Sequence, residues 1–462
     1  MTPHGARAGE DAEDLDVEEV LALVMNSNGN HLPDPEARGE TDSARTHRRP
    51  DPPAGPGTRH RATPWPEARV LAERAGRNAI RAARRAPVSA PLGTALGLTL
   101  AAPLDALTDL PSFDTSAMDG WAVCGPAPWH VRDEGVLAGH AAPAPLTDGE
   151  AVRIATGARI PTDTSAVLRS EHGRTDDKGR LYATRDVVPG QDIRPRGQEC
   201  RTGDQLLAVG TLVTPAVLGL AAAAGYDTVT AVPRARAEVL VLGDELLATG
   251  LPHDGLIRDA LGPMLPPWLR ALGAEVTAVR RVRDDADALH EAITASDADV
   301  ILTTGGTAAG PVDHVHPTLR RIGAELLVDG VTVRPGHPML LARTTETQHL
   351  VGLPGNPLAA VSGLLTLAEP LLRILAARPA PEPYTLPLRD AVHGHPHDTR
   401  LVPVVLRGDE AVPLHYNGPA MLRGIAAADA LAVVPPGGSE PGQEAELLDL
   451  PWASGGIGVC FT

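Results

Sequence analysis

Residues 299–315 read DVILTTGGTAAGPVDHV, and this stretch indicates both a fold and a site. The apolar run Val300-Ile301-Leu302 predicts a buried strand, which stops at the pair Gly305-Gly306. A third glycine, Gly310, and the carboxylate of Asp313 follow before a helical pattern begins. Glycines let backbone N–H groups approach a ligand closely, and a helix N-terminus favours negative charge. We therefore expect an anion site in a strand–loop–helix unit.

The composition excludes several classes of partner. The formal net charge of −17 at pH 7 repels phosphate backbones, which argues against nucleic acid. Three scattered cysteines are too few for a disulfide framework and fit a reducing compartment. The sequence begins with no signal-peptide pattern and has no run of about 18 apolar residues typical of a membrane helix. We expect a cytoplasmic protein that binds neither nucleic acid nor a membrane.

The order of apolar and polar segments predicts an α/β multidomain protein. Strand and helix patterns alternate from about residue 236, which is typical of βαβ units and a doubly wound parallel sheet. Small β-domains and a linker domain surround this part. The predicted parts are a disordered tail (1–62), a linker domain in two segments (63–122 and 191–235), an inserted small β-domain (123–190), the α/β domain (236–378) and a C-terminal β-domain (379–462).

Chemically distinctive residues follow three of the predicted strands of the α/β domain. They are Gly243-Asp244-Glu245, Gly305-Gly306 and the LPGNP stretch at 353–357. Ligands of such sheets bind at the carboxyl ends of the strands. The TTGG loop is neither a P-loop nor a dinucleotide fingerprint, and glycine-rich loops are also common as purely structural features. Its position favours an oxyanion site.

Acidic residues recur at the same predicted sheet edge. Asp244 and Glu245 come just past one strand, and Asp259, Asp285 and Asp313 hold comparable loop positions. One interpretation is that these acids cap helices. The other is Mg²⁺ coordination, because Mg²⁺ prefers one or two carboxylates together with substrate phosphate. Several acids beside an anion loop favour a metal-assisted phosphoryl site, with Asp244, Glu245, Asp259 and Asp313 as candidate ligands.

Taken together, the motifs resemble those of the MoeA family, the molybdopterin molybdenumtransferases. The resemblance runs from about residue 111 to 435 and is carried by these stretches: PSFDTSAMDGWAV (111–123), ATGARIP (155–161), GDEL, the GG…G…D loop, RPGHP (334–338) and GLPGNP (352–357). By physics alone, Asp119 in the first stretch is a turn residue, and the last stretch is a rigid loop or a helix cap.

The resemblance implies a fold and a reaction. The fold is a homodimer of four-domain subunits with an elongated linker domain, a MogA-like α/β domain and active sites between subunits. The reaction hydrolyses adenylated molybdopterin and transfers molybdate to its dithiolene, giving molybdenum cofactor and AMP with the help of Mg²⁺. A molybdopterin adenylyltransferase is a possible partner protein.

The resemblance also assigns roles to residues of this chain. The implied catalytic residues are Asp119, Thr156, Glu245, Asp285 and Asp313. The implied pterin-, nucleotide- or anion-binding residues are Gly305, Gly306, Gly310, Arg334, His337, Pro354, Gly355, Asn356 and Pro357.

The chain departs from the family pattern at positions that bind oxyanions. A threonine, a Ser-Asn pair, a serine, a lysine and a second serine are replaced by Leu242, Ala260-Leu261, Ala308, His337 and Ala359. Each change removes a hydroxyl, an amide or a fixed positive charge. Because histidine titrates near pH ~6.5, we expect molybdate binding to tighten as the pH falls and His337 gains a proton.

Two interpretations of these departures remain open. One is an active molybdenum insertase with a remodelled anion pocket, and the other is a catalytically weakened paralogue that binds pterin or a partner protein and regulates. The retained acids favour the first.

Overall fold

The computed structural model describes residues 62–139, 144–307 and 313–451. All of them belong to the unit formed by residues 60–462. Nearly all of the predicted disordered tail, together with Ala308 and Gly310, lies outside the described residues.

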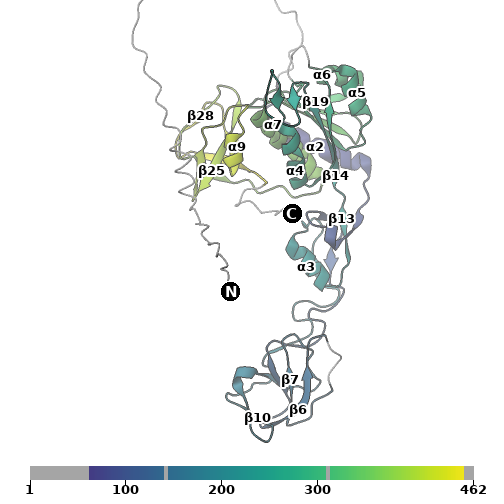
Figure 1. Cartoon of the computed structure of the whole chain (residues 1–462), viewed down its shortest axis with the longest axis vertical. Helices are drawn as coiled ribbons and strands as arrows, with labels where there is room; N and C mark the ends of the chain where they lie inside the picture. The colour runs from purple at the N-terminus through teal and green to yellow at the C-terminus, as the bar shows by residue number, and fades with distance from the viewer. Residues whose placement is uncertain (1–61, 140–143, 308–312, 452–462) are drawn as a thin grey trace, which may run out of the picture. The chain divides into compact units, whose positions relative to one another are not determined.

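A six-stranded sheet forms the centre of the α/β part (Figure 1). Its strand order is β17-β14-β18-β22-β21-β19, and the first four of these strands run parallel. The predicted parallel sheet is thus confirmed there. Strand β21 runs antiparallel to β22 because residues 344–348 are too short a connection for a crossover, and β19 pairs antiparallel with β21. The strands are β14 (Ala235–Leu242), β17 (Ala274–Val282), β18 (Val300–Thr304), β19 (Glu325–Asp329), β21 (Leu340–Arg343) and β22 (His349–Leu353).

Strand β14 is apolar at successive positions because helices cover both faces of the sheet. Val239 and Val241 pack with α4, α7 and α8, whereas Leu240 and Leu242 pack with α5 and α6. The sheet is therefore doubly wound, as the alternation of patterns predicts. The helices are α4 (Leu261–Ala271), α5 (Ala286–Thr294), α6 (Val315–Arg321), α7 (Pro357–Gly363) and α8 (Glu369–Leu375).

The segment from α7 to α8 is one continuous helix with a π-helical stretch, η3 (Leu364–Ala368). Pro370 has no N–H to donate to the preceding turn, and such a lost bond is a common cause of a local helical irregularity. By length and composition, residues 357–375 are apolar enough to cross a membrane. The helix is instead 89% buried inside the protein, which is the position of a core helix.

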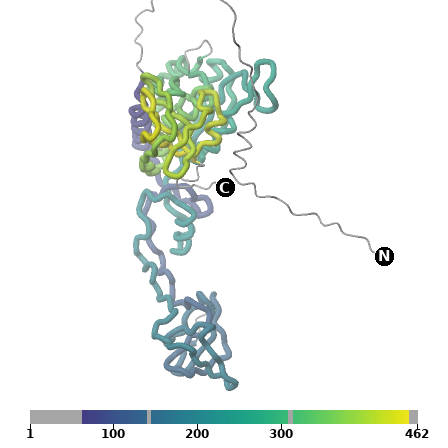
Figure 2. Tube along the Cα trace, turned by 90° about the vertical axis from the view of Figure 1, so that its left-hand side faces the viewer, coloured from purple at the N-terminus to yellow at the C-terminus, as the bar shows by residue number. Residues whose placement is uncertain are grey.

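The first described helix, α2 (Trp65–Ala83), completes this core, although it belongs to the segment 63–122 that we predicted as part of the linker domain. Its small residues lie against α8 and η3, and Trp65 Nε1 donates to Thr366 Oγ1 at 3.0 Å. Arg373 Nη2 donates to Glu73 Oε1 at 2.8 Å. In Figure 2 the purple trace of α2 lies beside the green helices of the α/β part.

The linker part contains a three-stranded sheet, β1-β13-β2, and the helix α3, which Thr214 caps by accepting from Val217 N. Two short ladders, β3 with β12 and β4 with β11, lead along the chain to the inserted segment. The elements are β1 (Val88–Pro91), η1 (Leu92–Thr94), β2 (Thr99–Leu100), β3 (Leu104–Asp105), β4 (Thr115–Ser116), β11 (Ile193–Arg194), β12 (Gln205–Leu207), α3 (Pro215–Ala223) and β13 (Thr228–Val232).

The inserted segment folds into its own six-stranded sheet with the order β8-β5-β7-β6-β10-β9. Trp121 and Trp129 are buried on one side of it, and Ala122 and Val152 on the other. The elements are β5 (Gly120–Val123), β6 (Trp129–Val136), β7 (Glu150–Ile154), β8 (Ala166–Arg169), η2 (Ser170–His172), β9 (Gly173–Thr175) and β10 (Arg180–Ala183).

The C-terminal part is a β-sheet with the order β20-β25-β27-β29-β23, and β26 pairs with β25 (Figure 1). Strand β20 comes from the preceding α/β segment, so the two parts share a sheet across the boundary that we predicted at residue 379. The elements are β20 (Val333–Arg334), β23 (Thr385–Pro387), β24 (Val392–His393), β25 (Thr399–Arg407), β26 (Glu410–Pro413), α9 (Arg423–Ala427), β27 (Ala430–Val434), β28 (Gly438–Ser439) and β29 (Glu444–Asp449).

Candidate functional site

A cavity of about 810 Å³ lies at the carboxyl ends of β14 and β18. The chain passes from β14 to β17 on one side and then returns to β18 on the other. The cavity therefore occupies the topological switch point, where open α/β sheets bind their ligands. The predicted site residues along its wall are Glu245, Asp259, Asp285, Gly305, Gly306, Asp313, Gly355, Asn356 and Pro357.

The glycine pair turns the backbone away from β18 as predicted. Gly305 and Gly306 have φ values of +84° and +66°, in the left-handed region that side chains rarely adopt. Gly305 N donates to Leu353 O at 2.7 Å, which holds the turn against the end of β22. A Cβ at Gly306 would lie 3.0 Å from Val315 Cγ2. The pair thus brings the chain close to the cavity without filling it.

Glu245 carries the most available carboxylate of the cavity wall. It lies three residues past β14, directly before the short parallel ladder of β15 (Leu246–Leu247) and β16 (Ile257–Arg258). Among the described residues its side chain forms no hydrogen bond or ion pair. Its oxygens lie over Gly243, where a Cβ would approach them to 2.8 and 2.9 Å. Gly243 therefore leaves room for this carboxylate.

Asp259 has no free oxygen, which does not fit the metal-ligand role that we expected. Its side chain is only 6% exposed, and Arg281 Nη2 donates to Oδ2 at 2.7 Å. Gly262 N donates to Oδ1 at 2.9 Å, so Asp259 also caps the first turn of α4. Asp244 is not part of the cavity wall, and its N–H donates to Asp284 Oδ2 at 3.3 Å.

Asp285 caps helix α5. Its Oδ1 accepts a 2.8 Å hydrogen bond from Ala288 N, so Asp285 is the N-cap residue. An N-cap carboxylate binds through one oxygen and is stabilised by the helix dipole. The second oxygen of Asp285 has no partner within the described part of the chain.

Asp313 lies at the start of α6 and is almost buried, with 8% of its side chain exposed. Oδ1 accepts from Val315 N at 3.1 Å, and His316 Nδ1 lies 3.5 Å from Oδ2. His316 Nε2 in turn lies 2.9 Å from Asp329 Oδ1. Burial raises the pKa of Asp313 above its ordinary value, against the opposing effect of the Val315 N–H. This carboxyl is therefore easier to protonate than an exposed aspartate.

The predicted four-acid magnesium set is not assembled. Among the described residues, no group of three or more His, Cys, Asp or Glu side chains is placed to hold a metal ion. Asp259 is saturated and Asp244 is off the cavity wall. Glu245 and Asp313 remain, and two carboxylates fit Mg²⁺ if a substrate phosphate supplies the other ligands.

Asp119 and Thr156 form a pair in the inserted sheet region, and neither lies on the cavity wall. Thr156 donates to Asp119 Oδ1 from its N at 2.7 Å and from its Oγ1 at 3.0 Å. These two hydrogen bonds, led by the one from the backbone, lower the pKa of Asp119.

Three other predicted residues are also absent from the described cavity wall: Arg334, His337 and Pro354. Arg334 Nε donates to Asp398 Oδ2 at 2.8 Å, and His337 Nδ1 lies 2.8 Å from Val331 O. The Arg334 side chain is therefore held by the C-terminal part, and the His337 ring is held within its own turn. Gly310 lies outside the described residues.

The first backbone N–H groups of α7 are hydrogen-bonded to a carbonyl of the C-terminal part. Leu358 N and Ala359 N donate to Pro419 O at 2.9 and 3.2 Å, and Asn356 makes no side-chain cap. The carbonyl takes the N–H groups that an anion would use at a helix N-terminus. Asn356 and Pro357 therefore shape the cavity wall, whereas the N–H groups of α7 are already occupied.

Our sequence reasoning missed several residues of the wall: Arg258, Arg283, Asp284, Thr304, His314, Ala420 and Leu422. Arg258 directly precedes Asp259, and Arg283 directly precedes the Asp284-Asp285 pair. Their positions beside predicted site acids were the available signal.

Three family models match the chain in succession. They are the MoeA N-terminal region (domains I and II) at residues 67–225, the probable molybdopterin binding domain at 238–374 and the MoeA C-terminal region (domain IV) at 385–450. A molybdopterin molybdenumtransferase 2 of Mycobacterium tuberculosis is 36% identical over 301 residues, which cover 61% of this chain and 73% of the relative. The chain therefore belongs to the MoeA family.

Other relatives agree with this membership. A molybdopterin molybdenumtransferase of Staphylococcus aureus is 27% identical over 369 residues, covering 76% of this chain and 87% of the relative. The crystal structure of a molybdopterin biosynthesis MoeA protein from Pyrococcus horikoshii matches with a TM-score of 0.65 at 24% identity. It covers 84% of this chain and 99% of that one, and it supports the fold.

Proposed function

We propose that this protein is a molybdopterin molybdenumtransferase, an enzyme that inserts molybdenum into adenylated molybdopterin and releases AMP. The observation that carries the proposal is the convergence of Glu245, Asp285 and Asp313 with the Gly305-Gly306 turn on one cavity. Most of the described cavity wall comes from the segment matched by the molybdopterin-binding family model, and Ala420 and Leu422 come from the C-terminal part. Its volume falls within the range of pockets that hold drug-sized ligands.

Each wall residue has a distinct task in this proposal. The Gly305-Gly306 turn admits the ligand close to the backbone. Glu245 and Asp313 are the residues that would hold Mg²⁺, which would supply charge neutralisation at the phosphate. Asp285 presents its second oxygen while Ala288 N holds the first.

His316 is suited to receive a proton next to Asp313. Its Nδ1 lies 3.5 Å from Asp313 Oδ2. Asp329 holds the far side of the imidazole ring at 2.9 Å, which orients the ring toward Asp313. A proton released during hydrolysis therefore has a positioned acceptor beside the cavity, and Asp313 stays ionised to hold Mg²⁺.

A second subunit completes the proposed site. The described cavity wall contains no residue of the inserted sheet region, although Asp119 and Thr156 match family motifs there. We therefore propose a homodimer in which this pair serves the cavity of the other subunit. A cytoplasmic location and contact with a molybdopterin adenylyltransferase belong to the same proposal.

The catalytically weakened paralogue is the less favoured alternative, because the cavity retains its acids. The deciding experiment incubates the protein with adenylated molybdopterin, molybdate and Mg²⁺ and measures AMP release and cofactor formation. Glu245→Gln is the matched inactive variant. Pterin binding without AMP release at any Mg²⁺ concentration would overturn the enzymatic proposal.

A further inference from the structure

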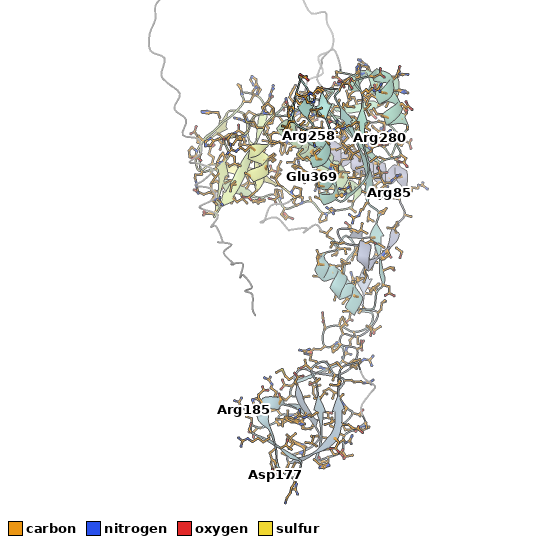
Figure 3. The ribbon with its side chains drawn as sticks, in the orientation of Figure 1. Arg85, Asp177, Arg185, Arg258, Arg280 and Glu369 are labelled. Carbon is orange, nitrogen blue, oxygen red and sulfur yellow. The ribbon has the colours of Figure 1, made fainter. Side chains whose placement is uncertain are left out.

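Two arginines on the cavity wall have no partner within the described part of the chain. Arg258 ends β16, and Arg283 follows β17. Neither side chain forms a hydrogen bond or ion pair with another described residue. Two neighbouring arginines differ in this respect, because Arg280 binds Glu238 and Arg281 binds Asp259. Figure 3 labels Arg258 and Arg280 in the α/β part.

The neighbouring carboxylates explain why these two guanidinium groups stay available. Asp259 is neutralised by Arg281, and Asp285 is held by the N-terminus of α5. Asp313 is held by Val315 N and by His316, and Asp284 accepts from Asp244 N. The acids of the wall are thus bound to partners other than Arg258 and Arg283, with Glu245 as the exception.

The cavity wall has more acidic than basic side chains, so an anionic ligand depends on the two arginines for attraction. Five carboxylates line the described wall, at Glu245, Asp259, Asp284, Asp285 and Asp313, and they repel an anionic ligand. Arg258 and Arg283 are the only arginine or lysine side chains on that described wall. The phosphate of a ligand that enters this cavity is therefore attracted to them.

The size of the cavity indicates which anion they meet. A volume of about 810 Å³ greatly exceeds the needs of a free tetrahedral oxyanion and suits a nucleotide-sized ligand. Arginine matches phosphate because its planar guanidinium donates two parallel hydrogen bonds. Thr304 adds a further donor to the wall, since its buried hydroxyl has no partner among the described residues.

We propose that Arg258 and Arg283 bind the phosphate group of the pterin nucleotide and so replace, in part, the hydroxyl and lysine donors that the chain has lost. The inference rests on the proposed function for the identity of the nucleotide. The two arginines are binding residues for the substrate phosphate.

The test measures kinetics in the full-length protein with Arg258→Ala, Arg283→Ala, the double variant and Arg258→Lys. Arg270→Ala, at the exposed end of α4 and away from the cavity, is the matched control. We expect the KM for adenylated molybdopterin to rise about tenfold for each alanine, because each removes a charge-assisted hydrogen bond. Arg258→Lys should recover part of the loss, and the KM for molybdate should not change.

A second readout separates this inference from the proposed function. Calorimetric titration with AMP should show binding to the wild-type protein and about 100-fold weaker binding to the double variant, without any need for turnover. If AMP binds in this arginine-dependent way but the protein releases no AMP from adenylated molybdopterin, the arginine site is supported and the proposed enzymatic function is contradicted. Normal turnover with unchanged KM for the pterin nucleotide in the double variant overturns the arginine site alone. A rise confined to the KM for molybdate also overturns it.

Discussion

Arg281 Nη2 donates a 2.7 Å hydrogen bond to Oδ2 of Asp259, and this bond makes a predicted metal ligand a structural residue. The other oxygen, Oδ1, caps α4 through Gly262 N. Both oxygens are therefore committed before any ligand enters the cavity. Asp259 therefore ties the start of α4 to β17 and leaves metal binding to other acids of the wall.

Asp259→Asn should destabilise the protein without changing its Mg²⁺ dependence. The amide keeps one acceptor but leaves the Arg281 guanidinium without its charge partner, at a cost of about 1–3 kcal/mol. Thermal unfolding and the Mg²⁺ dependence of AMP release measure the two effects. The control is Asp297→Asn, which breaks the exposed pair with Arg236 and should cost much less stability. Unchanged stability with weakened Mg²⁺ dependence would restore Asp259 as a ligand.

Gly243→Ala should disable the site by moving Glu245. The new Cβ would lie 2.8 and 2.9 Å from the Glu245 oxygens, so the carboxylate must shift. A displacement of about 1 Å at a reacting group lowers rates on the order of 100-fold. Gly250→Ala is the control, since Gly250 also has a positive φ of +85° but no atom within 4 Å of the added Cβ. Equal loss of AMP release in both variants would mean that backbone strain, and not Glu245, is responsible.

Asp313→Asn should abolish AMP release and stabilise the fold at neutral pH. Because burial raises the pKa of Asp313, the folded protein binds this proton more tightly than the unfolded chain. The resulting stability is present below the unfolded pKa of 3.8 and is lost as the pH rises through the higher folded value. Asparagine carries no charge, so the melting temperature should rise at pH 7.5 and the gain should vanish near pH ~3.8. A lower melting temperature at pH 7.5 would show that the ionised carboxylate supports the fold.

His349 should make the protein acid-sensitive. This histidine on β22 is 1% exposed, and neither ring nitrogen has a partner among the described residues. Burial, helped by the charge of Arg343, lowers its pKa from 6.5 to about 4. The unfolded state thus binds more protons between these values, so stability is full above pH 6.5 and falls, by about 3 kcal/mol in all, as the pH drops toward 4.

His349→Leu is the direct test of this acid sensitivity. Leucine buries no unpaired nitrogen, so we expect stability at pH 7.5 to be equal or higher and the loss between pH 6.5 and 4 to shrink. Chemical unfolding at several pH values measures both. His130→Leu, on the exposed surface of the inserted sheet, should leave the profile unchanged. An identical slope in wild type and His349→Leu would assign the acid sensitivity to other groups.

The parts of this fold that local patterns encode were predictable. The alternation of apolar strands with helices gave the doubly wound sheet, and Gly305-Gly306 marked the end of β18 because positive φ angles favour glycine. Partner choice is not encoded locally. Nothing near Asp259 indicates that Arg281 pairs with it, and nothing near Trp65 indicates Thr366.

The side-chain partners at the site were not predicted for the same reason: they lie far from one another in the sequence or depend on the folded turn. His337 contacts Val331 within a tight turn, and Arg334 reaches Asp398 in a different sheet. The family resemblance implied an anion-binding role for both, and in the structure each side chain has another partner. Our sequence reasoning missed Arg258 and Arg283 because an exposed arginine is usually a solvated surface residue, and nothing in the sequence placed these two on the cavity wall.

The contact between α2 and the end of the long helix also determines when the protein can finish folding. Trp65 and Thr366 are 301 residues apart, and ribosomes add roughly 5–20 residues per second. For about 15–60 s after α2 is made, its alanine-rich face therefore has no partner from its own chain. A nascent chain of this protein must keep that face from aggregating until nearly four fifths of the polypeptide exists, and chaperone demand during synthesis should peak in this interval.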